Sequence, residues 1–265
     1  MPIHATAVVD PRADIDATAD IGPYVVIDGP VVVGAGTRLL PYVHLTGHTI
    51  IGRDNVIHTG AVLGGAPQDV SYTDAPTGLR LGDRNLIREH AEISRATKLE
   101  RPTTLGDDNF LFGHSHVAHD CQLGNGVILA DGALLGGHVS VDDRAFISGN
   151  CVVHQFVRVG RLTMLRGLSR TSRDVPPFAM MDGTHTVRGI NRVGLRRAGL
   201  PAERIRAVQR AFVTLFGGRR NLRQALAEVD AGPRTDEVDE LLAFIRASTR
   251  GVCVGPRSGE VRSEE

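Results

Sequence analysis

Tryptophan is absent from this chain of 265 residues, and aromatic residues make up only 4% of it. A core built from mixed helices and sheets usually contains more of these large side chains. Their scarcity is a first indication that the chain is built from a repeat of small aliphatic units.

Strong charge and long apolar runs are lacking as well. Thirty basic and thirty acidic residues give a formal net charge of zero, which argues against general nucleic-acid binding. No apolar run is long enough to span a membrane, and the N-terminus lacks the features of a secretory signal, so we expect a cytoplasmic protein without a membrane span. Cys121, Cys151 and Cys253 have no CxxC spacing and are predicted to be packed thiols.

Aliphatic residues recur at every sixth position. Starting from Ile3, eleven consecutive sixth residues up to Leu63 are Ile, Leu or Val, and the frame resumes from Leu81 to Leu165. Eleven such hits have chance odds of roughly one in ten million, given how common these residues are. The period of six is typical of a parallel β-helix, in which three hexads close one triangular coil.

Residues 1–172 are therefore predicted to form this β-helix, with about nine coils. Polar segments near 68–78 and 94–104 interrupt the pattern and are predicted to be projecting loops. Residues 173–255 begin with a Pro-rich connector and continue with helical spacing, which predicts a small helical C-terminal domain of three helices. We expect residues 256–265 to be a disordered tail.

The segment GHSHVAHDCQLG (113–124) concentrates histidines and suggests a metal site, a catalytic base or polar decoration of a scaffold. Residues separated by three hexads stack on successive coils, about 4.8 Å from one another. His119, Gly137 and Gln155 therefore form one column, and Asp120 and His138 form the adjacent one. With His154, these residues should converge on one edge of the prism.

Two chemistries use convergent histidines on such a scaffold. A zinc enzyme needs about three ligands and an open position, as in a γ-type carbonic anhydrase. Acyl transfer to a hydroxyl needs one neutral imidazole, a group that holds its tautomer and a donor for the oxyanion. A His-Asp pair with a glycine N–H stacked over it fits acyl transfer better, although zinc remains an alternative.

Longer motifs favour acyl transfer over a zinc enzyme. QDVSY (68–72), HVAHDC (116–121), GGHVSVDD (136–143), VVHQFVRVG (152–160) and GINRVGLRRAG (189–199) resemble the family of UDP-N-acetylglucosamine O-acyltransferases, which begin lipid A biosynthesis. The resemblance extends from the first hexad to Gly251. It implies a homotrimer of left-handed parallel β-helices, with active sites between subunits. It also implies transfer of an (R)-3-hydroxyacyl group from acyl carrier protein to the 3-hydroxyl of the UDP-sugar, or to a 3-amine in its amino analogue, with no metal or other cofactor.

The resemblance also implies roles for single residues. His119 would be the general base, Asp120 would orient it, and the Gly137 N–H would stabilise the oxyanion. Five further residues would contact the sugar nucleotide or the acyl-pantetheine arm: Asp69, His116, His138, His154 and Gln155. Asn191 and Arg197 would reach the nucleotide, and Gly167 would lie at the end of the acyl-chain groove.

This chain departs from the family pattern at three places. Ser71 stands where the family often has lysine, Ala198 replaces a second arginine, and Arg166 adds bulk beside Gly167. Arginines of the helical domain would suit an acidic carrier protein: Arg204, Arg206, Arg210, Arg219, Arg220 and Arg223. The related N-acyltransferase of the same pathway usually has an extra N-terminal domain and is disfavoured, and a scaffold without activity is the remaining alternative.

Overall fold

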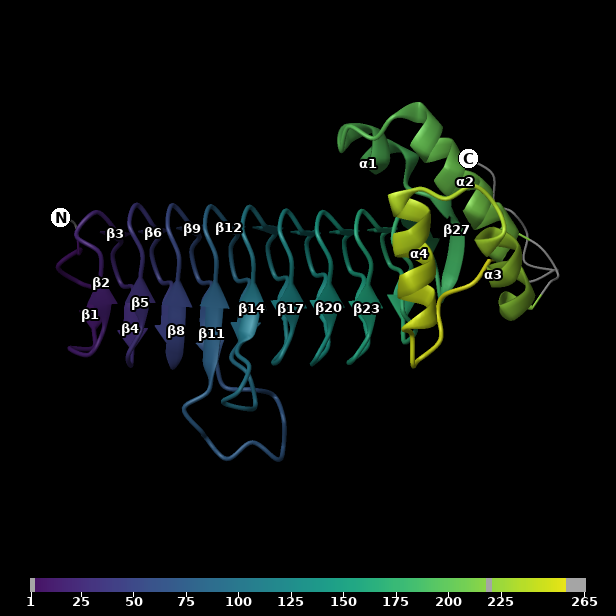
Figure 1. The fold of residues 1–265 in the computed structure, drawn as a ribbon. Helices are drawn as coiled ribbons and strands as arrows, with labels where there is room; N and C mark the ends of the chain where they lie inside the picture. Colours follow the sequence, from purple (N-terminus) through teal and green to yellow (C-terminus); the bar gives the residue numbers. More distant parts are fainter. Residues whose placement is uncertain (1–2, 218–220, 256–265) are drawn as a thin grey trace.

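A computed structural model describes residues 3–217 and 221–255. The chain winds into a long three-sided prism, and its helices gather at the C-terminal end of that prism (Figure 1). Sheet 1 contains β1 (Val8–Val9), β4 (Val26–Asp28), β7 (His44–Thr46), β10 (Val62–Gly65), β13 (Glu92–Ser94), β16 (His116–Val117), β19 (Leu134–Leu135), β22 (Val152–Val153) and β25 (Arg170–Thr171). Sheet 2 contains β2 (Asp14–Ile15), β5 (Val32–Val33), β8 (His48–Ile51), β11 (Gly78–Leu81), β14 (Thr103–Leu105), β17 (Gln122–Leu123), β20 (Ser140–Val141) and β23 (Arg158–Val159). Sheet 3 contains β3 (Asp20–Ile21), β6 (Arg38–Leu39), β9 (Val56–Ile57), β12 (Leu86–Ile87), β15 (Phe110–Leu111), β18 (Ile128–Leu129), β21 (Phe146–Ile147), β24 (Met164–Leu165), β26 (Ala179–Asp182) and β27 (Thr186–Ile190).

Successive coils pair in parallel with a constant offset. Val8 pairs with Val26 and Ser140 with Arg158, so a regular coil contains three hexads. Most strands are very short, and the last residue is usually an aliphatic side chain that fills the interior. The predicted left-handed parallel β-helix with helices after it is confirmed. Only the β26–β27 pair is antiparallel among the described strands.

The turns between sheets define three edges. We call the turns from sheet 1 to sheet 2 the first edge, those from sheet 2 to sheet 3 the second edge, and those from sheet 3 to sheet 1 the third edge. On the first edge Asp120, His138 and Phe156 have positive φ angles of 61°, 60° and 65°. Non-glycine residues seldom adopt this conformation, and here it recurs once in each of these coils because each must turn in the same way.

Two loops leave the prism at the first edge, below β11 and β14 in Figure 1. Leu86 pairs with Val56 in the coil before it and with Phe110 in the coil after it. The coil with the first loop is therefore five hexads long, and the coil with the second loop is four hexads long, instead of the regular three. Because both additions are whole hexads, Leu99 stays in phase with the repeat and yet is 62% exposed.

In the described part of the chain, four helices cover the C-terminal end: α1 (Arg192–Arg197), α2 (Ala202–Phe216), α3 (Leu222–Asp230) and α4 (Asp236–Arg246). The short helix α1 was not expected from the aliphatic spacing. Arg161 of the last coils binds Glu240 of α4 at 2.7 Å, and the Arg158 guanidinium lies 4.1 Å from the Phe244 ring centroid. The expected tail, residues 256–265, lies outside the described residues.

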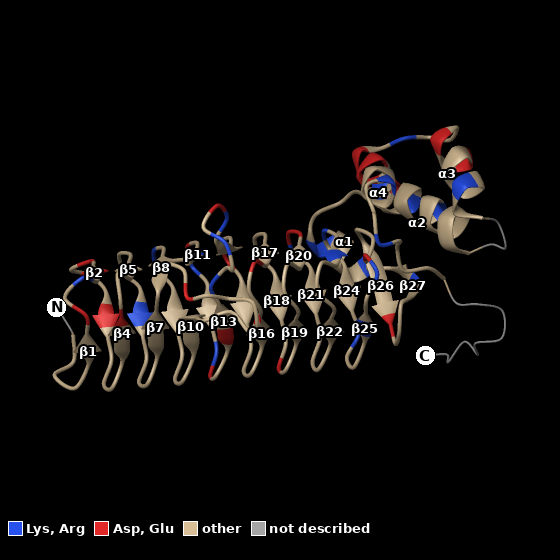
Figure 2. Ribbon diagram, turned by 90° about the horizontal axis from the view of Figure 1, so that it is seen from below, with Lys and Arg blue, Asp and Glu red and all other residues tan. Residues whose placement is uncertain are grey.

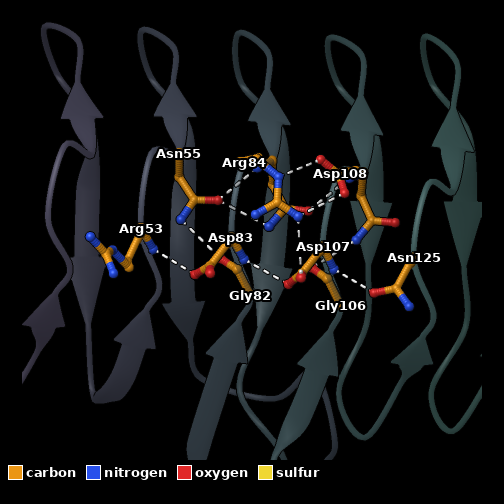
Figure 3. Close-up of polar contacts among 11 residues, drawn as sticks. Arg53, Asn55, Gly82, Asp83, Arg84, Gly106, Asp107, Asp108 and Asn125 are labelled. Carbon is orange, nitrogen blue, oxygen red and sulfur yellow. Dashed lines mark hydrogen bonds and ion pairs between the residues drawn. The ribbon is translucent and has the colours of Figure 1, made fainter.

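Asparagines stabilise the second edge from inside the prism (Figure 3). The Asn55 side chain accepts the Asn85 backbone N–H at 2.8 Å, and the Asn85 side chain accepts the Asn109 N–H at 2.9 Å. The side chains of Asn55 and Asn85 are almost completely buried. An outer row repeats the pattern at the surface, where the Asn125 side chain accepts the Asp107 N–H at 2.8 Å. Each of these coils is thereby fixed to the next by a side chain as well as by the sheets.

Replacing Asn85 by Ala leaves the buried Asn109 N–H without an acceptor. An unsatisfied buried donor costs about 1–3 kcal/mol, so we expect Asn85→Ala to lower the free energy of unfolding by that amount in urea titrations. Asn125→Ala is the matched control, since water can replace the lost hydrogen bond at this more exposed position. This variant should lower the free energy of unfolding by less than about half as much as Asn85→Ala. Equal losses in the two variants would contradict this account of the buried row.

Candidate active site

A buried histidine and an aspartate form the centre of the first edge. His119 is 8% exposed, and its Nδ1 lies 2.8 Å from Asp120 Oδ2. A carboxylate only accepts hydrogen bonds, so Nδ1 carries the proton and Nε2 keeps a free lone pair. This tautomer is the one required of a general base that acts through Nε2.

Asp120 is held from several sides. The backbone N–H of Thr97, in the second loop, donates to Asp120 Oδ1 at 3.1 Å, and the Thr97 hydroxyl donates to Oδ2 at 2.8 Å. The Asp120 N–H in turn donates to the Thr103 hydroxyl oxygen at 2.8 Å. The second loop therefore fixes the carboxylate that orients His119, a function that its sequence does not reveal.

Gly137 lies against the His119 ring on the next coil. A Cβ atom at position 137 would be 2.7 Å from His119 Nε2 and 2.5 Å from Cε1, so only glycine leaves room for the imidazole. Within the described residues, no hydrogen bond occupies the Gly137 N–H. A free backbone donor thus lies in the residue that packs against the free nitrogen of His119.

His138 completes the cluster around Asp120. Its Nε2 lies 3.6 Å from Asp120 Oδ2, and its ring stacks on Phe156 with centroids 4.4 Å apart. Burial lowers the pKa of His138, while the negative charge of Asp120 opposes this shift. Phe156 was missed in the sequence, although its position one regular coil after His138 could have revealed it.

The first loop contributes a second acidic group. Asp69 accepts hydrogen bonds from the Ser71 N–H and hydroxyl, and these bonds lower the pKa of Asp69. The charges of His119 and His138 lower it further, so Asp69 interacts electrostatically with the histidine cluster. Ser71, which stands in place of the family's lysine, thus serves to hold Asp69.

His116 belongs to a polar chain beside this cluster. Its Nδ1 lies 3.3 Å from Glu92 Oε2, and Glu92 also accepts a hydrogen bond from Gln68 of the first loop at 2.8 Å. His154 and Gln155 are exposed on the same edge, one coil beyond Gly137. The predicted site residues up to Gln155 therefore lie on the first edge, in the loop that projects from it (Asp69) or in the strand that leads into it (His116).

The remaining predicted residues lie elsewhere in a single copy of the chain. Gly167 is on the third edge, as is His114, whose ring stacks on His90 at 5.1 Å. Asn191 caps α1: its Oδ1 accepts the Gly194 N–H at 2.9 Å, and its Nδ2 donates to the Leu162 carbonyl on the second edge at 2.9 Å. Arg197 is exposed at the end of α1. One copy does not bring these residues to His119.

The cluster also has the composition of a metal site. One ligand atom from each of His119, Asp120 and His138 lies within 4.8 Å of the other two, close enough for a transition metal to replace the Nδ1 proton. Cys121 is no candidate ligand, because its thiol is buried and donates to the Gly136 carbonyl oxygen. Burial raises the pKa of Cys121 to about 12.

Comparisons with known proteins identify the family of the chain. A family model described as UDP-N-acetylglucosamine O-acyltransferase, domain 2, matches residues 174–253, and one for bacterial transferase hexapeptides matches residues 30–65. The chain is 42% identical over 254 residues to an acyl-[acyl-carrier-protein]–UDP-N-acetylglucosamine O-acyltransferase of Thermodesulfovibrio yellowstonii, covering 95% of this chain and 98% of the relative. The chain belongs to the UDP-N-acetylglucosamine O-acyltransferase family.

Solved structures give the same result. The UDP-N-acetylglucosamine acyltransferase of Francisella novicida is 33% identical with a TM-score of 0.92, covering 97% of this chain and 96% of that one. The enzyme of Bacteroides fragilis is 36% identical with a TM-score of 0.91, covering 94% and 99%. No helix within the described ranges is long and apolar enough to cross a membrane.

The electrostatics of the cluster are testable by NMR. We expect the imidazole of His138 to titrate below the usual histidine pKa of 6.5, because burial disfavours its cation. Asp120→Asn should lower the pKa of His138 further by removing a nearby negative charge, whereas Asp108→Asn, on the second edge, should leave it unchanged. A rise in the pKa of His138 on Asp120→Asn would show that the two groups are not coupled in this way.

Proposed function

We propose that this chain transfers an (R)-3-hydroxyacyl group from acyl carrier protein to the 3-hydroxyl of UDP-N-acetylglucosamine, the first step of lipid A biosynthesis. The observation that carries the proposal is the His119–Asp120 pair, with its free Nε2 beside the unoccupied Gly137 N–H. Membership of the family supports the choice of substrates. A 3-amine in the corresponding amino sugar would be an acceptor for the same base.

The reaction follows from the position of these groups. His119 Nε2 removes the proton of the sugar hydroxyl as its oxygen attacks the thioester carbon. The oxyanion that forms accepts a hydrogen bond from the Gly137 N–H. When the carbon–sulfur bond breaks, the imidazolium returns its proton to the leaving thiolate, and Asp120 stabilises the transient positive charge. Every proton is accounted for by His119 and the two substrates, so the proposal includes no metal or other cofactor.

Other residues of the first edge are proposed to bind the substrates. Asp69, with its lowered pKa, is a permanent acceptor for sugar hydroxyls near His119 and His138. We assign His116, His138, His154 and Gln155 to contacts with the sugar nucleotide or the acyl-pantetheine arm, because all of them lie along this edge. Their lengthwise arrangement suits two extended substrates that meet at one point.

The residues on the other edges point to a second copy of the chain. We propose a cytoplasmic homotrimer in which Gly167, Asn191 and Arg197 of one subunit approach His119 of another. A Cβ atom at Gly167 would meet only the Gly149 carbonyl oxygen, at 3.6 Å, and we propose that the absence of a side chain there leaves room for the acyl chain. The Arg166 guanidinium binds Asp182 at 3.1 Å, so the charge next to Gly167 is paired.

The helical domain is proposed to dock the acidic carrier protein. Arg204 is less suited to this contact than expected, because its guanidinium already binds Asp236 and Glu237. Arg206, Arg210 and Arg223 have no ion pair within the described residues. Arg219 and Arg220 lie outside those residues.

His119→Ala tests the assignment of the base. Loss of a general base should reduce kcat by about 10²–10⁴-fold in an assay with UDP-N-acetylglucosamine and a 3-hydroxyacyl carrier thioester. His4→Ala, at the far end of the prism, is the matched control and should retain full activity. Near wild-type turnover in His119→Ala would refute the mechanism. Stoichiometric zinc in the purified protein that is lost in this variant would favour the carbonic anhydrase alternative.

A further inference from the structure

Arginines without acidic partners gather where the first edge reaches the C-terminal end. Arg170 lies in β25, the last strand of sheet 1, which pairs with β22 one coil earlier, and Arg173 lies in the shortened turn that follows β25 (Figure 2). The Arg250 Nε donates to the Ser172 carbonyl oxygen at 3.4 Å, which brings the C-terminal segment into the same place. Arg170, Arg173 and Arg250, together with Ser172 and His185, are called the arginine cluster below.

Contacts within the cluster leave its positive charge uncompensated. Arg170 donates to the Thr184 hydroxyl at 3.0 Å, and none of the three arginines makes an ion pair within residues 3–217 and 221–255. Nearby arginines differ, since Arg161 is paired with Glu240 and Arg166 with Asp182. Unpaired guanidinium groups in one place are suited to bind a phosphate.

His185 is held neutral inside the cluster. Its Nε2 accepts the Ser172 N–H at 2.9 Å and lies 3.0 Å from the Ser172 hydroxyl oxygen, so Nε2 carries no proton. Burial, and then the positive charges of Arg173 and Arg170, lower the pKa of His185. The imidazole therefore orders Ser172 without adding charge, and the arginines alone provide the attraction for an anion.

We propose that the arginine cluster binds the phosphodiester of the donor's phosphopantetheine arm. This inference rests on the proposed function, because it places the thioester carbon at His119. Arg170 and Arg173 lie in or just after β25, three strands beyond β16, the strand that precedes His119, and this is about 14 Å along the prism at the spacing of parallel strands. The arm from sulfur to phosphorus has about thirteen bonds, equivalent to roughly four residues of extended chain, and spans about 14 Å.

The diphosphate of the acceptor, UDP-N-acetylglucosamine, does not match the distance from His119 to the arginine cluster. It is attached to C1 of the same sugar ring whose 3-hydroxyl is deprotonated at His119, so it stays within about one ring width of the reacting carbon. The extended arm would instead run along the first edge past His154 and Gln155, both exposed, where its amides find polar partners. Arg250 follows the end of α4 at Arg246 by four residues, so the chain connects the cluster directly to the helical domain, where the carrier protein is proposed to dock.

The test compares two donors that lack the carrier protein: 3-hydroxyacyl-pantetheine and its 4′-phosphorylated form. For the unmodified chain we expect kcat/KM to be about tenfold or more higher with the phosphorylated donor, the size of effect given by charge-assisted hydrogen bonds. In the double variant Arg170→Gln/Arg173→Gln this preference should fall to near one. The KM for UDP-N-acetylglucosamine should change by less than about twofold.

Arg53→Gln, on the second edge, is the matched control and should keep the preference, because its backbone rather than its side chain is bound to neighbouring coils in the described part of the chain. Thermal unfolding of each variant verifies that the fold is intact. A preference that survives in the double variant overturns the inference, and so does a rise in KM for the UDP-sugar alone, which would assign the cluster to the nucleotide. Absence of acyl transfer by the unmodified chain with any donor would instead refute the proposed function.

Discussion

The parallel pairing of equal coils, each of three hexads, is the constraint on which the rest of the structure depends. Residues separated by three hexads stack above one another on successive coils, so residues that are far apart in the chain lie about 4.8 Å from each other. Very short strands with one inward aliphatic side chain fill the narrow interior, which explains why the chain needs so few aromatic residues. Asn55, Asn85 and Asn109 add hydrogen bonds along the second edge, where the strands themselves supply none.

The same constraint builds the site. The turn geometry that repeats from coil to coil places Asp120 and His138 above one another, and it leaves the N–H of Gly137 without a partner among the described residues. The two loops enter at this edge, and they supply polar groups that regular coils lack. Thr97 fixes Asp120, and Ser71 fixes Asp69. A rigid scaffold thus positions His119, while the irregular segments supply the polar groups around it.

Much of this arrangement could be predicted because the period of six is strong and local. Once coils of three hexads are assumed, the column of His119, Gly137 and Gln155 follows without a structure. The lengths of the two loops could not be predicted, because additions of whole hexads keep the later residues in phase with the repeat. Leu99 therefore falls at a position that predicts a core residue, although it is exposed. Thr97 could not be predicted, because its contact depends on how the second loop folds back. The third-edge position of Gly167 follows from the same count, because Gly167 lies two hexads after Gln155, but the positions of Asn191 and Arg197 on the short helix α1 needed the structure.

The central claim is that the first edge of one copy carries the chemistry and that another copy completes the site. Mixed assemblies of two variants test it most directly. His119→Ala lacks the base, and Arg197→Glu opposes nucleotide binding from the other subunit, so each variant alone should be inactive. The two variants are mixed in equal amounts, unfolded and refolded together. About a quarter of the sites then combine an intact His119 with an intact Arg197 from the neighbouring copy, so about a quarter of the wild-type activity should return. No recovery in a mixture that assembles normally, or full activity of Arg197→Glu alone, would contradict the account.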